Sequence, residues 1–292
     1  MPRKLIYQII VIVISSICLS CETILDTDTS LEKPKLVVNS LFTQDSTWNV
    51  SLTWTRNIGD TLRFLYFQPV GEAARVTIYD EHHSPIENLT FGVTDYYTFA
   101  FLGNTAPVFG KTYSIQVEVE GEAILKATSY LPPPVPILSV VVDSSLYQST
   151  KDVLMEVVFK DPRDKINYYQ VKVFKRINNS IGDEVLFFAP IDPALKNDYS
   201  SSRSLLLSDS HFNGGEYRLR LKVSGSGYQQ VKSPVKIDLQ SVSEEYYKYF
   251  TTKNLQINSR LDPFAQPAEI FSNIENGLGI FAGYGSSVVE LK

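Results

Sequence analysis

From residue 35 onward, the chain runs in short segments in which apolar and polar positions alternate. Every second position is apolar in one such segment, at Trp48, Val50, Leu52 and Trp54. Alternation of this kind is typical of strands that bury one face, and turn residues separate the segments. The number and spacing of the segments predict a mainly β protein with two tandem immunoglobulin-like or fibronectin-like β-sandwiches.

A run of prolines divides the alternating segments into two groups. Pro132-Pro-Pro-Val-Pro136 lacks most of the backbone donors that a strand ladder needs, and it stiffens the chain. We therefore predict a first sandwich over residues 35–131, a proline-rich linker over 132–136 and a second unit over 137–292. The second unit consists of a sandwich, a helix and a C-terminal segment.

The hydrophobic period changes after the second group of segments. Ser241 and Glu244 have the spacing of a helix capping box. Apolar side chains then recur at helical intervals, at Val242, Tyr246, Tyr249 and Phe250. This pattern predicts one helix over about residues 242–255. Its aromatic face either docks on the second sandwich, the usual fate of such a face, or forms a binding surface.

The segment that follows the helix is rich in glycine. Residues 273–285 contain Gly277, Gly279, Gly283 and Gly285. Glycine lets a chain turn with positive φ and pack closely against its neighbours. We expect the chain to finish as a strand from Val288 to Leu291.

The first twenty residues have the layout of an export signal. Basic Arg3 and Lys4 precede an apolar stretch, and small residues close the segment before Cys21. The apolar stretch is too short for a transmembrane helix, which needs about 20 residues. The small Ser20 before Cys21 resembles a bacterial lipoprotein signal, which implies cleavage before Cys21 and acylation of that residue.

Two alternatives to lipidation remain open, an ordinary secretory cleavage and an uncleaved anchor. Cys18 stands where such signals usually carry leucine, and bulky Ile17 disfavours Cys18 as the lipidated residue. We therefore predict a signal peptide over residues 1–20 and lipidation at Cys21. Residues 21–34 are polar and acidic without periodicity, which predicts a flexible tether.

Composition narrows the classes of function. Cys18 and Cys21 are the two cysteines of the chain, so a disulfide framework and a cysteine zinc site are excluded. The net charge is −5 at pH 7, and loss of Arg3 and Lys4 with the signal makes the mature chain more acidic. Such a chain, with no basic run, is unsuited to nucleic acid as a partner or to a broad electrostatic grip on anionic lipids.

Several segments together resemble a known family. They are Pro34-Lys-Leu-Val-Val38, Phe109-Gly-Lys-Thr-Tyr-Ser-Ile-Gln-Val117, Leu131-Pro-Pro-Pro-Val-Pro-Ile137 and Ser272-Asn-Ile-Glu-Asn-Gly-Leu-Gly-Ile-Phe-Ala-Gly-Tyr284. With the lipoprotein cysteine, they are similar to domain of unknown function family 4249 of Gram-negative envelope lipoproteins. The first half also resembles a carboxypeptidase regulatory-like β-sandwich, which implies architecture and not peptidase activity.

The resemblance carries expectations about location and partners. It implies a protein of the outer membrane that is anchored in the lipid bilayer through acylated Cys21, on a face that is left open. Members of the family are often encoded beside TonB-dependent transporters. This implies an accessory role with an outer-membrane transporter as the partner.

No catalytic, cofactor or metal motif stands out. The histidines lie in or beside predicted turns without visible partners, at His82, His83 and His211. Four aspartates are explained as turn and loop residues, namely Asp143, Asp152, Asp161 and Asp164. A pair of carboxylates for glycoside hydrolysis remains open, because distant acids can meet in space. We predict no catalytic residues, no metal and no cofactor.

The predicted working surface lies on exposed loops. In loop 57–73 the aromatic residues Phe64, Tyr66 and Phe67 are candidates for contact with a ligand or partner, as are Asn276 and Tyr284 in the glycine-rich segment. The leading hypothesis is a non-enzymatic binding or accessory module. The alternatives are a glycan- or peptide-acting hydrolase with paired carboxylates, and a structural or adhesion module.

Overall fold

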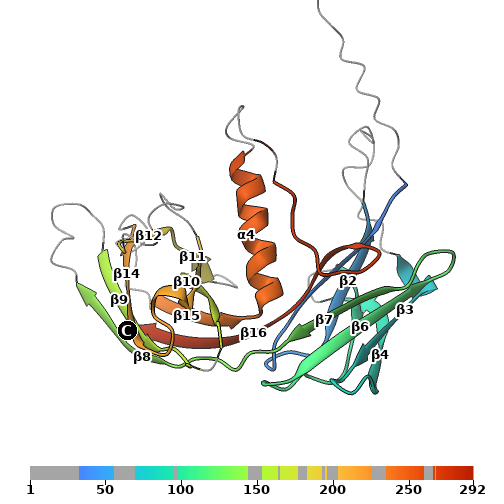
Figure 1. The fold of residues 1–292 in the computed structure, drawn as a ribbon, viewed down its shortest axis with the longest axis horizontal. Coiled ribbons are helices and arrows are strands. Elements are labelled where there is room, and N and C mark those ends of the chain that lie inside the picture. Colours follow the sequence, from blue (N-terminus) through green and yellow to red (C-terminus); the bar gives the residue numbers. More distant parts are fainter. Residues whose placement is uncertain are drawn as a thin grey trace, which may run out of the picture.

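The computed structural model describes residues 33–55, 70–94, 98–143, 153–163, 165–176, 183–192, 195, 203–224, 235–259, 266 and 268–291. Cys21, Phe64, Tyr66 and Phe67 lie outside these residues, as do the predicted signal and most of the tether. The predicted mainly β fold is confirmed. In the described part of the chain, the strands form two sheets of a sandwich-type fold, and one α-helix lies near the C-terminus (Figure 1).

The first half contributes one end of the larger sheet. Its strands are β1 (Leu36–Phe42), β2 (Asn49–Trp54), β3 (Ala74–Tyr79), β4 (Pro85–Val93), β5 (Phe99–Leu102), β6 (Thr112–Val119) and β7 (Leu125–Tyr130), and the short 3-10 helix η1 (Gly71–Ala73) precedes β3. They follow one another in the order β1-β2-β5-β4-β3-β6-β7. The alternation predicted for β2 is confirmed, because Trp48, Val50 and Leu52 are buried. Stacked and edge-on rings around Trp48 form the centre of this core.

The second half packs two sheets face to face. Its strands are β8 (Ile137–Asp143), β9 (Val153–Lys160), β10 (Tyr168–Arg176), β11 (Asp183–Val185), β12 (Phe188–Pro190), β13 (Leu205–Ser208), β14 (Glu216–Val223) and β15 (Val235–Val242), with the 3-10 helix η3 (Asp209–His211) after β13. The smaller sheet has the order β12-β14-β9-β8, whereas β10, β11, β13 and β15 belong to the larger sheet. Buried side chains of both sheets form a second apolar core.

One long strand, β16 (Leu278–Leu291), belongs to both halves. Leu278 to Gly283 pair in parallel with β1, and Tyr284 to Leu291 pair antiparallel with β15. Figure 1 shows β16 passing below the helix from the first half to the second. The expected final strand, Val288 to Leu291, therefore begins ten residues earlier, and the C-terminal segment is shared and not confined to the second unit. The predicted division into two units otherwise stays a prediction.

The helix α4 (Glu244–Ser259) begins and ends later than the predicted 242–255. Ser243, and not Ser241, caps it, because its Oγ accepts a hydrogen bond from the Tyr246 amide at 3.3 Å. Ser241 remains in β15, and its Oγ accepts a hydrogen bond from the Val135 amide at 3.1 Å. Pairing of β15 with β16 extends through Val242 and holds Ser241 in an extended conformation.

The aromatic face of α4 docks on the larger sheet, as the pattern indicated. Tyr246 is buried, and its hydroxyl donates a hydrogen bond to Gln170 Oε1 on β10 at 2.6 Å. The Tyr246 side chain also packs in one apolar cluster with Ile280 and Ala282 of β16. The helix therefore covers the junction between the halves and not the second sandwich alone.

Three glycines of β16 let the chain cross other backbone closely. Gly279 has φ +109°, and a Cβ there would lie 2.0 Å from the carbonyl oxygen of Val38. A Cβ at Gly283 would lie 2.7 Å from the oxygen of Tyr130, and one at Gly285 would lie 2.5 Å from the oxygen of Pro132. The end of β7 and the proline-rich linker thus run directly over β16. Because the opposing atoms are backbone, they cannot move aside as a flexible side chain can.

We predict that Gly283→Ala lowers the free energy of unfolding by about 1–3 kcal/mol, the range for overpacking in a dense site. Gly92→Ala is the matched control, because its Cβ would meet only a Leu102 side-chain atom at 3.4 Å. Urea unfolding of both variants measures the effect. Equal midpoints for the two variants would contradict the close crossing.

Candidate ligand-binding site

The outer face of β3, β6 and β7 carries a hollow of about 420 Å³, lined mostly by residues with polar side chains. Strand alternation creates it, because neighbouring positions point to opposite faces of the sheet. Ile115, Val117 and Leu125 point into the core, whereas the residues beside them point outward. An open antiparallel sheet with one buried face and one solvated face is common, so the hollow needs further features to qualify as a site.

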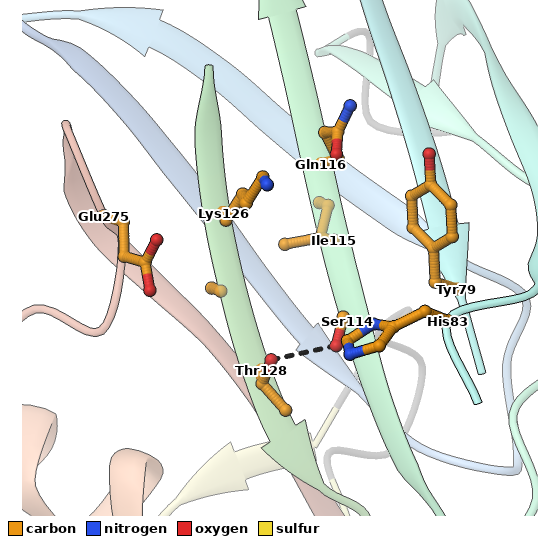
Figure 2. Close-up of a pocket in the computed structure, with 9 residues that line it drawn as sticks. Tyr79, His83, Ser114, Ile115, Gln116, Lys126, Thr128 and Glu275 are labelled. Carbon is orange, nitrogen blue, oxygen red and sulfur yellow. Dashed lines mark hydrogen bonds between the residues drawn. The ribbon is translucent and has the colours of Figure 1, made fainter. Parts of the chain in front are cut away.

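Figure 2 shows residues that line the hollow. Those named in the figure are Tyr79, His83, Ser114, Ile115, Gln116, Lys126, Thr128 and Glu275. Strand register aligns them, since Tyr79 pairs with Ser114, Ser114 with Thr128, and Gln116 with Lys126. A single bridge between Lys126 and Glu275 adds the segment before β16 to the far edge. The hollow therefore combines residues that are almost 200 positions apart in the chain.

Several polar groups of the hollow are available to a ligand. Lys126 and Glu275 are exposed, and within the described residues their side chains form neither a hydrogen bond nor an ion pair. The same holds for the exposed imidazole of His83. By contrast, Ser114 and Thr128 share a hydrogen bond of 2.9 Å between their hydroxyl oxygens. Two fixed hydroxyls thus lie between side chains that are free to bind.

The rims of the hollow have unusual backbone geometry. His83, with φ 58°, and Asn276, with φ 60°, are the non-glycine residues of the described chain with positive φ. The first lies in the turn at one rim, and the second follows Glu275 at the other. The pairing of β3 with β4 also has a bulge at the first rim, where Ile86 of β4 is the extra residue opposite Ile78 and Tyr79. Bulges re-aim side chains beside binding sites, and strained residues gather at functional positions.

Hydrogen bonds hold both rims. Asp80 Oδ1 accepts bonds from the amides of Ser84, at 2.8 Å, and His82, at 2.9 Å. The Ser84 bond is the main reason that the pKa of Asp80 is below its ordinary value. At the opposite rim, Asn276 Nδ2 donates to the Ile124 carbonyl at 2.9 Å. Both turns are therefore fixed before any ligand arrives.

The structure separates the residues predicted for the working surface. Asn276 lies at the rim of the hollow, where its side chain supports the backbone. Tyr284 is elsewhere, partly buried under α4 with its ring 6.2 Å from that of Tyr246, and burial raises the pKa of its hydroxyl. Tyr79 and Lys126 were not predicted. Their outward positions follow from strand alternation, but only the pairing of β3, β6 and β7 brings them together.

A second concavity of about 550 Å³ lies at the junction between the halves. Its lining is more apolar and includes Tyr130, Pro132, Pro133, Pro162, Ile166 and Tyr168, beside the first residues of α4. Lys165 spans it, with Nζ 3.8 Å from the centre of the Tyr130 ring. This cation–π contact links a loop of the second half to the first half.

The buried acids Asp161 and Asp209 hold loops together. Asp161 accepts hydrogen bonds from the Tyr169 hydroxyl and, at 2.7 Å, from the Gly214 amide. Asp209 Oδ2 accepts one from the Asn167 amide at 2.8 Å, whereas its buried Oδ1 has no partner among the described residues. Burial raises the pKa of Asp209 above its usual range. With 2% and 0% of their surfaces exposed, these carboxyls do not face a cleft that would admit a glycan.

Three other acids, Glu118, Glu120 and Glu122, line a hollow of about 390 Å³ beside the hairpin that joins β6 to β7. Glu118 accepts a hydrogen bond from Gln116, and Glu122 accepts one from Lys33. Asp143 is exposed at the end of β8, and Asp152 and Asp164 lie outside the described residues. Asp238 is buried on β15, where Gln240 Nε2 donates to its Oδ2 at 2.8 Å, and Lys172 lies opposite it in the register of β10. No group of three or more histidines, cysteines or acids is placed to hold a metal ion among the residues described.

Comparisons with known proteins give a family and little else. A family model described as a domain of unknown function, DUF4249, matches residues 22–289. No curated protein sequence matches the chain. Among solved structures, trypsin-activated alpha-2-macroglobulin from Escherichia coli aligns at 12% identity with a TM-score of 0.24, covering 72% of this chain and 14% of that one.

Salmonella alpha-2-macroglobulin reacted with methylamine is a second match, at 12% identity and a TM-score of 0.23. It covers 88% of this chain and 14% of that one. The chain therefore spans about one seventh of the length of either structure. Similarity at this level carries no argument about the site.

The raised pKa of Asp209 predicts a dependence of stability on pH. A carboxyl whose folded pKa exceeds the unfolded value contributes most below about pH 4, and the contribution is lost as the pH rises through the folded pKa. Asp209→Asn removes the charge and keeps an acceptor for Asn167. Between pH 4 and 7 this variant should lose less unfolding free energy than the wild type, as measured by urea denaturation.

The exposed Glu184 supplies the control for this prediction. Glu184→Gln should leave the pH profile close to that of the wild type. A profile of Asp209→Asn that runs parallel to the wild-type profile would contradict the assignment.

Proposed function

We propose that this chain, which belongs to the DUF4249 family, is a lipid-anchored, non-enzymatic binding module of the bacterial outer membrane. The description of the family assigns no activity. The hollow on β3, β6 and β7 is the binding site in this proposal. The observation that carries it is the set of exposed, unengaged side chains of His83, Lys126 and Glu275 between two fixed rims.

The anchor would hold this site near the membrane. Lys33 Nζ lies 2.9 Å from Glu122 Oε1, in the hairpin that joins β6 to β7. The twelve residues from Cys21 to Lys33 span at most about 40 Å when fully extended. Acylation at Cys21 would therefore keep Lys33 within about 40 Å of the bilayer surface, and the β6–β7 hairpin beside it.

Two observations favour binding over the alternatives. The buried acids Asp161 and Asp209 are engaged in loop contacts, which does not favour hydrolysis by paired carboxylates. A purely structural or adhesion module has no need of a polar hollow with free side chains. An outer-membrane transporter is the protein partner that we propose from the family resemblance, in keeping with an accessory role.

Lysine reactivity tests whether the hollow is occupied in the envelope. We predict that Lys126 reacts more slowly with an acylating reagent in isolated cell envelopes than in purified full-length protein, because an occupant covers its Nζ. Lys160 on β9 is the matched control, since it is also exposed but lies on the second half. Mass spectrometry of the labelled peptides measures both rates, and equal reactivity of Lys126 in the two preparations would refute occupancy.

The same envelopes test the anchor. Cys21→Ala should move the protein into the soluble fraction, because the acyl chains would be lost. Cys18→Ala is the control and should stay with the membrane. Retention of both variants in the membrane would contradict lipidation at Cys21.

A further inference from the structure

We propose that the hollow binds an uncharged glycan chain, lying across β3, β6 and β7 with one sugar ring stacked on Tyr79. This inference rests on the proposed function and names the class of its ligand. It goes beyond that function because neither the proposed location nor the family specifies the chemical class of the ligand.

The lining residues form a track across the sheet. Tyr79 lies on β3, Gln116 on β6, Lys126 on β7 and Glu275 on the segment bridged to β7 (Figure 2). Neighbouring strands are about 4.8 Å apart, so four such chain segments span about 14 Å. A track of this length and an open hollow of about 420 Å³ fit a short stretch of a linear oligosaccharide better than a single small metabolite.

The polarity of the track matches hydroxyl groups. A sugar hydroxyl both donates and accepts hydrogen bonds, so it is best met by a mixture of donors and acceptors. Lys126 supplies donors and Glu275 supplies acceptors, while Gln116 Nε2 is engaged with Glu118 Oε1 at 2.8 Å and leaves its own amide oxygen as an acceptor. The formal charges of Lys126 and Glu275 cancel, which suits a ligand without net charge.

The position of Tyr79 supplies the apolar contact. A tyrosine offers a flat apolar ring with a polar tip, which suits the C–H face of a sugar. Its pairing with Ser114 on β6 is regular, so Tyr79 alternates outward from the buried Ile78, onto the face that carries Ser114 and Thr128. Tyr79 is partly exposed at the end of the track, where a ring can stack on a ligand.

Other classes of ligand fit the hollow less well. An extended peptide that adds a strand needs free backbone groups, but β6 is paired on both sides, with β3 and β7, and Glu275 occupies the outer edge of β7 at Lys126, where the hollow lies. A polyanion would meet Glu275, with Glu118 close by, and find one lysine. An apolar ligand would leave the surrounding hydroxyl, amide and charged groups without partners.

Affinity electrophoresis of the detergent-extracted full-length protein tests the ligand class. The gels contain soluble starch, galactomannan or arabinoxylan as uncharged polymers, and polygalacturonate or heparin as charged comparators. We expect retardation by at least one uncharged polymer. Tyr79→Ala should weaken that binding by about tenfold, whereas Tyr79→Phe should keep it within about threefold, because the ring is retained.

Two further variants guard the result against effects on folding. Gln116→Ala combined with Lys126→Ala removes two polar contacts at outward positions and should also weaken binding by about tenfold or more. Lys160→Ala, on the other half, should leave the retardation unchanged. Each variant is required to have the thermal midpoint of the wild type before its binding is compared.

The outcomes separate this inference from the proposed function. Retardation by the charged polymers alone, or retardation that survives both Tyr79→Ala and the double variant, would overturn the glycan assignment. No retardation by any polymer, with Lys126 still protected in envelopes, would overturn the glycan and leave the binding function standing. Equal reactivity of Lys126 in envelopes and in purified protein would instead remove the proposed function itself.

Discussion

The structure depends on the close crossing of β16 beneath the end of β7 and the proline-rich linker. Gly283 and Gly285 bring β16 so near to the carbonyl oxygens of Tyr130 and Pro132 that no side chain fits between them. Because of this contact, β16 can pair with β1 at one end and with β15 at the other. The two halves are thereby joined through a continuous set of backbone hydrogen bonds and not only through a linker. The helix α4 adds to the junction by packing Tyr246 over Ile280 and Ala282.

The same crossing positions the candidate site. Residues 273–276 lead directly into β16, and Asn273 fastens them to it: its Oδ1 accepts from the Phe281 amide at 3.0 Å and its Nδ2 donates to the Phe281 carbonyl at 2.8 Å. The Glu275 amide then donates a hydrogen bond to the Lys126 carbonyl at 2.8 Å, which occupies the outer edge of β7 at that residue. An edge that would otherwise attract another strand becomes the rim of a polar hollow. The placement of Glu275 opposite Tyr79 therefore depends on the strand that joins the halves.

The features that were predictable from the sequence are those that depend on the pattern of neighbouring residues. The burial of Trp48, Val50 and Leu52 was predictable because every second residue of a strand with one buried face is apolar. The helix was visible for the same reason, although its start shifted from Val242 to Glu244 because β15 continues to Val242. The reach of β16 was not predictable, since its partners lie far away in the chain and its glycines disfavour a strand when read alone.

The candidate site shows the same limit. Asn276 could be singled out from the glycine-rich segment. Tyr284 in that segment is covered by α4, and the sequence predicted docking of this helix but not its position over β16. Tyr79, Lys126 and Glu275 are ordinary residues in separate strands and loops until pairing assembles them. The ligand track is thus a product of tertiary register, which no local pattern encodes.

The most direct test of this account is hydrogen exchange along β16 in the native protein. If one strand joins the halves, the amides of Ile280 to Ala282 and of Ser286 to Val288 should exchange with the same free energy of opening, close to that of global unfolding. Two distinct free energies, with one half of β16 opening while the other stays protected, would show that the halves unfold separately. That result would contradict the central role assigned to the crossing.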